Sequence, residues 1–509
     1  MSYFMGIDLG TTSARAIIVD GENGQVVAAG TSEYPLYTPQ PLWAEQDPAD
    51  WWCGTIEAVK KALFEGAGKL GKAPEIVAIG LSGQMHGVVL LDEEGEILGP
   101  SLIWCDGRAQ AQCDYITEEV GAEKLIELTA NPAIVGFSAP KLIWLREHCP
   151  DQFLRAAHFL LPKDFIRYKL TGEFASEVSD ASGTLLFDVA NRKWSEEMCH
   201  KLEIDSDLLP DVYESTVVSG QVSPQAAAQT GLRAGTPVVG GGGDQAAGAV
   251  GNGIVRAGLV SSAIGSSGVV FAHSAIPALD PGGRVHTFCH AVPGSWHVMG
   301  VTQGAGISLR WFRDEIAGRH EIETALVSGT DIYEILTRQA AEAPAGSEGL
   351  IFLPYLMGER TPHLDPQARG VWFGLTAAHR RSHLVRSVLE GVSYSLKDCL
   401  SLLEDMGLPI EEIRASGGGG KSQLWRQIQA DMFEREVVTI NATEGPAYGA
   451  ALLAGVGTGF WKDVGSACDS CIQIRSRTAP IHANSEVYRR YYPLYKEIYI
   501  KLKPLYRQL

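Results

Sequence analysis

Two aspartates, Asp8 and Asp244, stand in comparable places in the sequence and could carry acid–base or metal chemistry. Each lies at or just past the end of an apolar stretch that predicts a buried strand, and each lies beside a glycine-rich turn. A carboxylate in such a place can hold the magnesium ion that bridges phosphate oxygens, or it can accept a proton from an attacking hydroxyl. Taken alone, either aspartate could instead cap a turn or the start of a helix. Both are therefore candidates for catalysis and for metal binding.

Three glycine-rich turns follow predicted strands, and their sequences are GTTS at 10–13, GSSG at 265–268 and GGGGKS at 417–422. Glycine lets the backbone approach an anion closely and point its N–H groups at it, and hydroxyl groups add further donors. Each turn alone could be a plain connection between two elements, but three in one chain favour phosphate binding. The third turn resembles a P-loop, yet Ala415 stands where that motif requires its first glycine, so a P-loop is disfavoured.

Two polar islands interrupt apolar stretches in the first third of the chain. Gln84, Met85 and His86 lie between two glycines and two apolar runs, and Trp104 and Asp106 follow a second apolar run. A sugar presents C–H faces and hydroxyl groups, so its site needs flat apolar surfaces together with directed hydrogen bonds. The alternatives are a buried core histidine and tryptophan and a structural ion pair between aspartate and arginine.

The composition is that of an acidic globular protein. The chain has 509 residues and a formal net charge of −18, which argues against a general attraction to nucleic acid or to an anionic membrane surface. The sequence shows neither a secretory leader nor an apolar run long enough to cross a bilayer. Nine cysteines, an odd number, fit reduced thiols better than a disulfide framework. We therefore expect a cytoplasmic protein that has no nucleic-acid or membrane partner.

Cys468 and Cys471 have the spacing of a CxxC motif, but no second cysteine pair or histidine pair accompanies them. A structural zinc site would lack half of its ligands. We therefore expect two loop thiols here and assign them no function.

The order of predicted elements indicates an α/β protein with two similar halves. Strands are expected at 3–8, 15–20 and 25–29, and the pattern of strand, glycine turn and strand recurs at 258–272. A helix is expected to start at Asp47-Pro48, a long one to span 383–406, and another to start at Ser422. After Gly459 no further strand is expected, and the tyrosine-rich C-terminal stretch reads as an amphipathic segment that packs on the body.

Three longer motifs resemble the FGGY family of carbohydrate kinases over nearly the whole chain. MGIDLGTTSARAIIVD at 5–20 is similar to the family's first phosphate loop, GFSAPKLIWLREH at 136–148 to its first signature, and GVWFGLTAAHRRSHLVRSVLEG at 370–391 to its second. Within the family, GLSGQMHGVVLLD, IWCDGR and WAEQDPADWW look most like the xylulokinase branch. One departure is Gln245, where many members of that branch have asparagine.

The resemblance implies two ribonuclease-H-like domains of the actin-like ATPase type with a central cleft, here residues 1–245 and 246–509. It implies ATP and Mg²⁺, phosphorylation of D-xylulose to D-xylulose 5-phosphate, Asp244 as the general base, and a possible homodimer. The metal residues would be Asp8 and Asp244. The sugar residues would be Met85, His86, Gln84, Trp104, Asp106, Asp244 and Gln245. The nucleotide residues would be Thr11, Thr12, Ser13, Arg15, Gly265, Ser266, Ser267, Gly306, Gly418, Gly419 and Lys421.

Two alternatives stay open. One is a kinase of the same family for another sugar or polyol, such as ribulose, gluconate or glycerol. The other, of a different class, is a non-catalytic actin-like protein that binds ATP. The two polar islands that suit a sugar argue against it. A dinucleotide-dependent oxidoreductase is set aside because no G-x-G-x-x-G turn follows the first strand.

Overall fold

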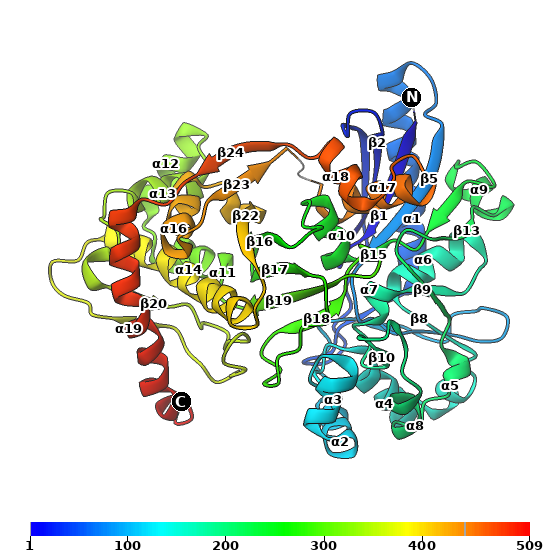
Figure 1. Cartoon of the computed structure of the whole chain (residues 1–509), viewed down its shortest axis with the longest axis horizontal. Coiled ribbons are helices and arrows are strands. Elements are labelled where there is room, and N and C mark those ends of the chain that lie inside the picture. The colour runs from blue at the N-terminus through cyan, green and yellow to red at the C-terminus, as the bar shows by residue number, and fades with distance from the viewer. Residues whose placement is uncertain (1, 442–443) are drawn as a thin grey trace.

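The computed structural model describes residues 2–441 and 444–509, and it contains two seven-stranded sheets that lie side by side, one in each half of the chain (Figure 1). In this part of the chain no helix is both long and apolar enough to cross a membrane. The expected α/β class is confirmed.

The first sheet has the strand order β13-β14-β5-β1-β2-β3, and β15 also pairs with β5. Strands β1, β2 and β3 form an antiparallel meander, while β5 and then β14 add in parallel to β1. The expected strands at the N-terminus are confirmed. The bounds are β1 (Tyr3–Leu9), β2 (Ser13–Asp20), β3 (Val26–Glu33), β5 (Ile76–Gly83), β13 (Val218–Gln221), β14 (Pro237–Val239) and β15 (Gly242–Gly243).

The second sheet repeats this topology. Strands β16, β17 and β19 form the meander, β22 and β23 add in parallel, and β24 closes the edge antiparallel, as β13 does in the first sheet. The predicted duplication is therefore confirmed. The bounds are β16 (Gly258–Ile264), β17 (Gly268–Ser274), β18 (His286–Cys289), β19 (Trp296–Thr302), β22 (Ile410–Ser416), β23 (Val437–Ile440) and β24 (Ile474–Thr478).

Two expectations about the C-terminal part were wrong. Strand β24 lies beyond Gly459, because a short, largely exposed edge strand of alternating polar residues carries little apolar signal. Cys468 and Cys471 are not in a loop, since both are buried on α18 (Val464–Cys471), where their side chains join an apolar cluster. The cysteines of the described residues are free thiols.

Helices join the two halves. Helix α1 (Pro48–Leu70), capped by Asp47 as expected, packs on β2 and β3. Helix α17 (Gly445–Gly457) belongs to the second half but packs on β1 and β5, and it also packs on α10 (Asp244–Gly251), which lies between the two sheets in Figure 1. A helix from the second half of the chain thus packs on the first sheet. The domain boundary between residues 245 and 246 stays a prediction.

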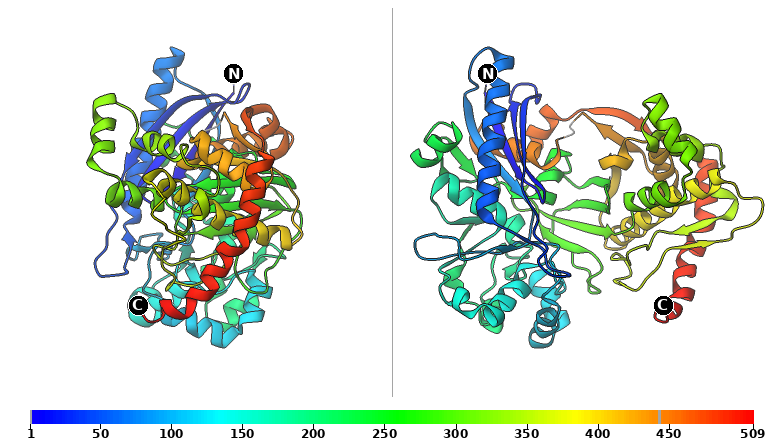
Figure 2. Two further views of the ribbon diagram at one scale, coloured as in Figure 1. Left: turned by 90° about the vertical axis from the view of Figure 1, so that its left-hand side faces the viewer. Right: turned by 180° about the vertical axis from the view of Figure 1, so that it is seen from behind.

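The second sheet is covered on its outer side by long helices, which face the viewer in the left view of Figure 2 and are seen from behind in the right view. Helix α14 (Arg381–Asp405) matches the expected long helix and ends before Gly407, whose φ is +81°. The expected helix from Ser422 is α16 (Gln423–Phe433), with Ser422 as its cap, and the C-terminal segment is α19 (His482–Tyr506), which packs on α16.

The remaining elements fall into two groups. In the first half they are β4 (Glu45–Gln46), β6 (Val89–Leu91), β7 (Ser101–Leu102), α2 (Gln110–Val120), α3 (Ala122–Thr129), α4 (Ser138–His148), α5 (Pro150–Leu154), β8 (His158–Leu160), α6 (Pro162–Thr171), β9 (Ala175–Glu177), α7 (Val178–Ala181), β10 (Phe187–Asp188), β11 (Lys193–Trp194), α8 (Glu196–Lys201), β12 (Asp211–Tyr213) and α9 (Pro224–Thr230). In the second half they are α11 (Gly306–Trp311), α12 (Arg319–Ser328), α13 (Ile332–Ala340), β20 (Ile351–Leu353), β21 (Val371–Phe373) and α15 (Gly417–Gly420).

Candidate active site

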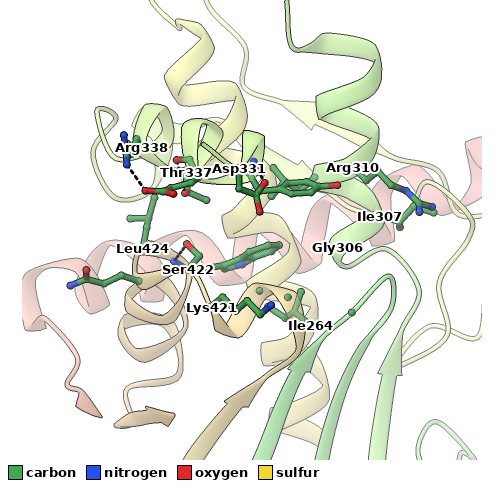
Figure 3. A pocket seen from close by; sticks show the side chains of 18 of the residues that line it. Ile264, Gly306, Ile307, Arg310, Asp331, Thr337, Arg338, Lys421, Ser422 and Leu424 are labelled. Atoms are coloured by element: carbon green, nitrogen blue, oxygen red, sulfur yellow. Dashed lines mark hydrogen bonds and ion pairs between the residues drawn. The ribbon is translucent and has the colours of Figure 1, made fainter. Parts of the chain in front are cut away.

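A cavity of about 790 Å³ opens in the second half, large enough for a nucleoside. The turn after β16, the start of α11, helix α13 and the segment from α15 into α16 form its walls (Figure 3). Six of the predicted nucleotide residues line it, namely Gly265, Ser266, Gly306, Gly418, Gly419 and Lys421.

Glycine is required where these walls approach one another. A Cβ atom on Gly306 would lie 2.2 Å from the carbonyl oxygen of Gly265, and one on Gly419 would lie 2.6 Å from the side chain of Ile264. Gly417 has a φ of +71°, which other residues rarely adopt. At Gly418, by contrast, the nearest protein atom to such a Cβ is 3.9 Å away, so this position faces the cavity.

A second cavity, of about 770 Å³, continues from the first and shares Gly418 and Lys421 with it. It reaches Asp244 and Gln245 at the start of α10, and the side chain of Arg426 also lines it. The two cavities therefore form a path from the outer part of the second half to the first turn of α10.

The carboxyl groups of Asp244 and Asp8 interact electrostatically. Burial and then the charge of Asp8 raise the pKa of Asp244 to about 7, and burial raises the pKa of Asp8 to about 6. One carboxylate oxygen of Asp8 is buried and has no hydrogen-bond partner among the described residues. A pair of carboxylates with a free oxygen suits a hard cation such as Mg²⁺. The described residues contain no group of three or more His, Cys, Asp or Glu side chains that could hold a metal ion.

Hydrogen bonds to Ser179 of α7 and to Ser215 hold the segment that leads into Asp244. The backbone N–H of Gly243 donates to the hydroxyl oxygen of Ser179 over 3.1 Å, and that hydroxyl donates to Glu177 over 2.7 Å. Ser215 also donates to Glu177, over 2.9 Å, and the backbone N–H of Gly241 donates to the carbonyl of Ser215. The start of α10 is thus fixed to buried groups of the first half.

The Met85–His86 turn meets this loop. A Cβ atom on Gly243 would lie 2.9 Å from the side chain of Met85, so the turn and the residue before Asp244 are in direct contact. His86 has a φ of +70°, which is rare for a residue with a side chain and is costly unless its surroundings impose it. Lys141 and Ser138 each donate to the carbonyl oxygen of His86 over 3.1 Å and hold it in this conformation.

Aromatic rings surround the imidazole of His86. Its Nδ1 lies 2.7 Å from the carbonyl oxygen of Gly183, and its ring centre lies 4.6 Å from that of Phe137 and 6.1 Å from that of Phe288. Burial lowers the pKa of His86 to about 3, so the ring is neutral near neutral pH. A neutral ring whose Nδ1 is engaged leaves Nε2 for one directed hydrogen bond.

The other sugar candidates, Gln84 and Trp104, are linked to the first phosphate-type turn. Gln84 donates to Gln46 over 2.8 Å, and Gln46 donates to the carbonyl of Thr11 over 2.7 Å. The indole N–H of Trp104 donates to the Thr11 hydroxyl over 2.9 Å, and 47% of the Trp104 side chain is exposed. The structure therefore connects the sugar candidates to that turn.

The carboxylate of Asp106 is fully buried and is engaged by other groups. It accepts from the backbone N–H of Ala44 over 2.7 Å and pairs with Arg108 over 2.8 Å. The Arg108 guanidinium also lies 3.6 Å from the ring centre of Trp43. This ion pair supports the loop, and a contact of Asp106 with a sugar stays a prediction.

The remaining nucleotide candidates do not line the two cavities, and they lie on the turns after β1 and β16 and at the start of β2. Thr12 and Ser267 are exposed, and Ser13 is half-buried at the start of β2. Arg15, on β2, forms an ion pair with Glu444 just before α17. This pair joins the first sheet to the second half.

Sequence reasoning missed the helical wall of the first cavity. Asp331, Tyr333, Thr337 and Arg338 from the start and body of α13 line it, as does Arg310 of α11 (Figure 3). An amphipathic helix pattern is visible in the sequence there, but it carries no motif that would distinguish a ligand-facing side from a solvated one.

Comparison with known proteins agrees with this geometry. Residues 3–251 match the N-terminal domain, and residues 260–458 the C-terminal domain, of the FGGY family of carbohydrate kinases. The chain is 38% identical to a xylulose kinase of Bacillus subtilis over 99% of its length and 98% of that protein, and 34% identical to a gluconokinase of the same organism over 100% and 98%. The crystal structure of xylulose kinase from Rhodospirillum rubrum superposes with a TM-score of 0.90 at 32% identity, covering 99% of this chain and 100% of that one.

Two sheets of the same topology, a nucleotide-sized cavity in the second half and a path from it to the carboxylate of Asp244 define a phosphotransferase of the ribonuclease-H-like type. The chain belongs to the FGGY family of carbohydrate kinases, and it is an enzyme that transfers phosphate to a sugar.

Proposed function

We propose that the enzyme phosphorylates D-xylulose to D-xylulose 5-phosphate with ATP. The observation that carries the proposal is the position of Asp244, which lines the inner end of the path from the nucleotide cavity while its neighbour Gly243 touches Met85. A nucleotide and a sugar that approached from these two sides would meet at this carboxylate. The similarity to xylulose kinases supports the choice of sugar.

In the proposed reaction Asp244 takes the proton from the 5-hydroxyl of the sugar as that oxygen attacks the γ-phosphorus in line. The new O–P bond forms while the bond from the γ-phosphorus to the bridging oxygen of ADP breaks. A base with a pKa near 7 is well matched to this task at neutral pH, because about half of it is ionised and the ionised form is still a good proton acceptor. Met85 would give the sugar apolar contact and His86 a directed hydrogen bond.

Asp8 and Asp244 are the residues that would hold Mg²⁺, which when bound supplies charge neutralisation between the phosphate oxygens. Apart from this, the backbone N–H groups of the Gly417–Gly420 segment and the side chain of Lys421 are the donors that face the nucleotide path. Thr11, Thr12, Ser13 and Arg15 would complete the phosphate site from the first half.

The test is an ADP-release assay with D-xylulose, D-ribulose, D-gluconate and glycerol, applied to the wild type and to Asp244→Ala. We expect D-xylulose to have the highest kcat/KM and the variant to lose about 10²- to 10⁴-fold in kcat, the usual contribution of a general base. ATP binding, followed by calorimetry, should persist in the variant. Near-normal turnover by the variant would contradict the assignment of Asp244 as the general base. A higher kcat/KM for another sugar would contradict the assignment of D-xylulose as the substrate.

Gluconate is the second candidate substrate, because the chain is also similar to a gluconokinase over its full length. A purely ATP-binding actin-like protein would show ATP hydrolysis without stimulation by any sugar in the same assay. The cytoplasmic location and the homodimer stay predictions of the sequence.

A further inference from the structure

The segment that follows β20 carries a cationic residue and bonds to Val301 and Arg284, close to the strand that holds His286. Arg360 belongs to the segment between β20 and β21, and its guanidinium group forms no hydrogen bond or ion pair with any of the residues that the structure describes. In a chain with 60 acidic and 42 basic residues, an arginine that is only partly exposed and lacks such a partner is unusual. Five donors therefore remain for a ligand.

The backbone around Arg360 is fixed against the end of β19. The carboxylate of Glu359 accepts from the backbone N–H of Arg360 over 2.7 Å, from that of Gln303 over 2.9 Å and from the hydroxyls of Thr302 and Ser395 over 2.6 and 3.0 Å. With these four donors its oxygens are engaged and do not pair with the neighbouring guanidinium. Arg360 is thus held on a rigid segment, which is how binding residues are preorganised.

The same segment runs next to the strand that carries His286. The backbone N–H of Thr361 donates to the carbonyl of Val301 over 2.9 Å, and the backbone N–H of Val301 donates to the Thr361 hydroxyl oxygen over 3.0 Å. That hydroxyl in turn donates to the carbonyl of Arg284 over 2.7 Å. His286 lies two residues further on, with its ring 5.8 Å from Phe137, the ring that contacts His86. Besides burial, the charge of Arg360 lowers the pKa of both His286 and His86, so it acts on the sugar-side imidazole.

We propose that Arg360 is a substrate-recognition residue that binds the end of the sugar opposite the phosphorylated hydroxyl, at a carbonyl oxygen of a ketose or at the carboxylate of a sugar acid. The proposal rests on the proposed function, because the sugar's orientation follows from Asp244 and Met85 at one end and His86 at the other. A guanidinium group donates strong hydrogen bonds to such sp² oxygens, and it distinguishes one polyol hydroxyl from another less well. Arg360 would also make substrate binding depend on the second half of the chain.

The experiment compares Arg360→Met, Arg360→Lys and the wild type with D-xylulose, D-gluconate and xylitol, which has five carbons but no carbonyl. We expect Arg360→Met to raise KM for the preferred ketose or sugar acid about tenfold or more, the usual effect of losing a hydrogen bond to a charged group. KM for ATP should stay within about twofold, and the lysine variant should lie between the two. The D-xylulose and D-gluconate arms distinguish the two carbonyl sources.

Arg369→Met is the matched control, because Arg369 lies in the same segment but is exposed and bonds only to nearby backbone carbonyls. An unchanged KM for the sugar in Arg360→Met, or an equal loss for xylitol and the preferred substrate, would overturn the proposal. Calorimetric measurement of the binding of the three compounds without ATP tests the role of Arg360 independently of the proposed function. If the wild type phosphorylates none of them, the proposed function fails. Binding of a ketose or sugar acid that depends on Arg360 would still support substrate recognition by this residue. Absence of such binding would contradict it.

Discussion

The backbone N–H of Gly243 donates a hydrogen bond to the hydroxyl oxygen of Ser179 over 3.1 Å. Because Asp244 is the next residue, this bond helps to fix where its carboxylate points. We expect Ser179→Ala to lower kcat about 2- to 10-fold, the kinetic equivalent of one ordinary hydrogen bond, with KM for ATP unchanged. Steady-state kinetics with Ser179→Thr, which keeps the hydroxyl, is the control and should show recovery. An unaltered kcat in the alanine variant would mean that the bond does not position Asp244.

Gly418 offers a way to test the nucleotide path without disturbing the fold. It lines both cavities, and an added Cβ would meet no protein atom closer than 3.9 Å. A leucine at this position should therefore be accepted by the protein but project into the space for the nucleotide. We expect Gly418→Leu to raise KM for ATP about tenfold or more, equivalent to about 1.4 kcal/mol of lost binding, with the sugar KM and the thermal midpoint little changed. A large loss of stability would show that the position is packed and not open.

Local sequence signals located the parts of this site that sit in turns after strands. The glycines of 265–268 and 417–420 could be predicted to approach one another or a ligand closely, since glycine has few other reasons to cluster there. The α13 wall could not be predicted, because its side chains lie on an ordinary amphipathic helix and reach the cavity only through long-range packing. Packing between the halves, such as that of helix α17 on β1, is equally invisible to local patterns.

The packing of α17 against the first sheet leaves no room for a side chain at Gly6 of β1. A Cβ atom on Gly6 would lie 1.8 Å from the carbonyl oxygen of Ala447. We expect Gly6→Ala to force the helix off the sheet and reduce the free energy of unfolding by about 3 kcal/mol or more, and to lower the soluble yield. The matched control is Gly68→Ala, on an exposed turn of α1 with no atom within 4 Å, which should gain about 0.5–1 kcal/mol. Urea denaturation of both variants measures the difference, and equal effects would contradict the tight contact.

Seven buried or partly buried histidines of the described residues have pKa values that burial lowers, and they respond to acid. The lowered value is about 3 for His297, whose ring stacks on Phe271 at 4.3 Å. The set is His86, His158, His273, His286, His290, His297 and His363. Below pH 6.5 the unfolded chain binds protons at these sites that the folded chain does not bind until its own lower pKa values are reached. The contribution of these histidines to the free energy of unfolding should therefore fall as the pH is lowered from 7 towards 5, by about 1.4 kcal/mol per pH unit for each histidine that is protonated only when unfolded. Asp8 and Asp244, whose folded pKa values are raised to about 6 and about 7, act in the opposite direction over this range.

A single substitution can isolate the contribution of His297. His297→Phe keeps an aromatic ring against Phe271 but removes the titrating group, so the slope of unfolding free energy against pH between 5 and 6.5 should decrease by about one proton. His482→Gln is the control, because His482 lies at the exposed start of α19 and its side chain is 82% exposed. Urea unfolding at a series of pH values gives the slope for each protein. If His297→Phe keeps the wild-type slope, the buried imidazole takes up its proton in the folded state as readily as in the unfolded chain, and the acid sensitivity arises elsewhere.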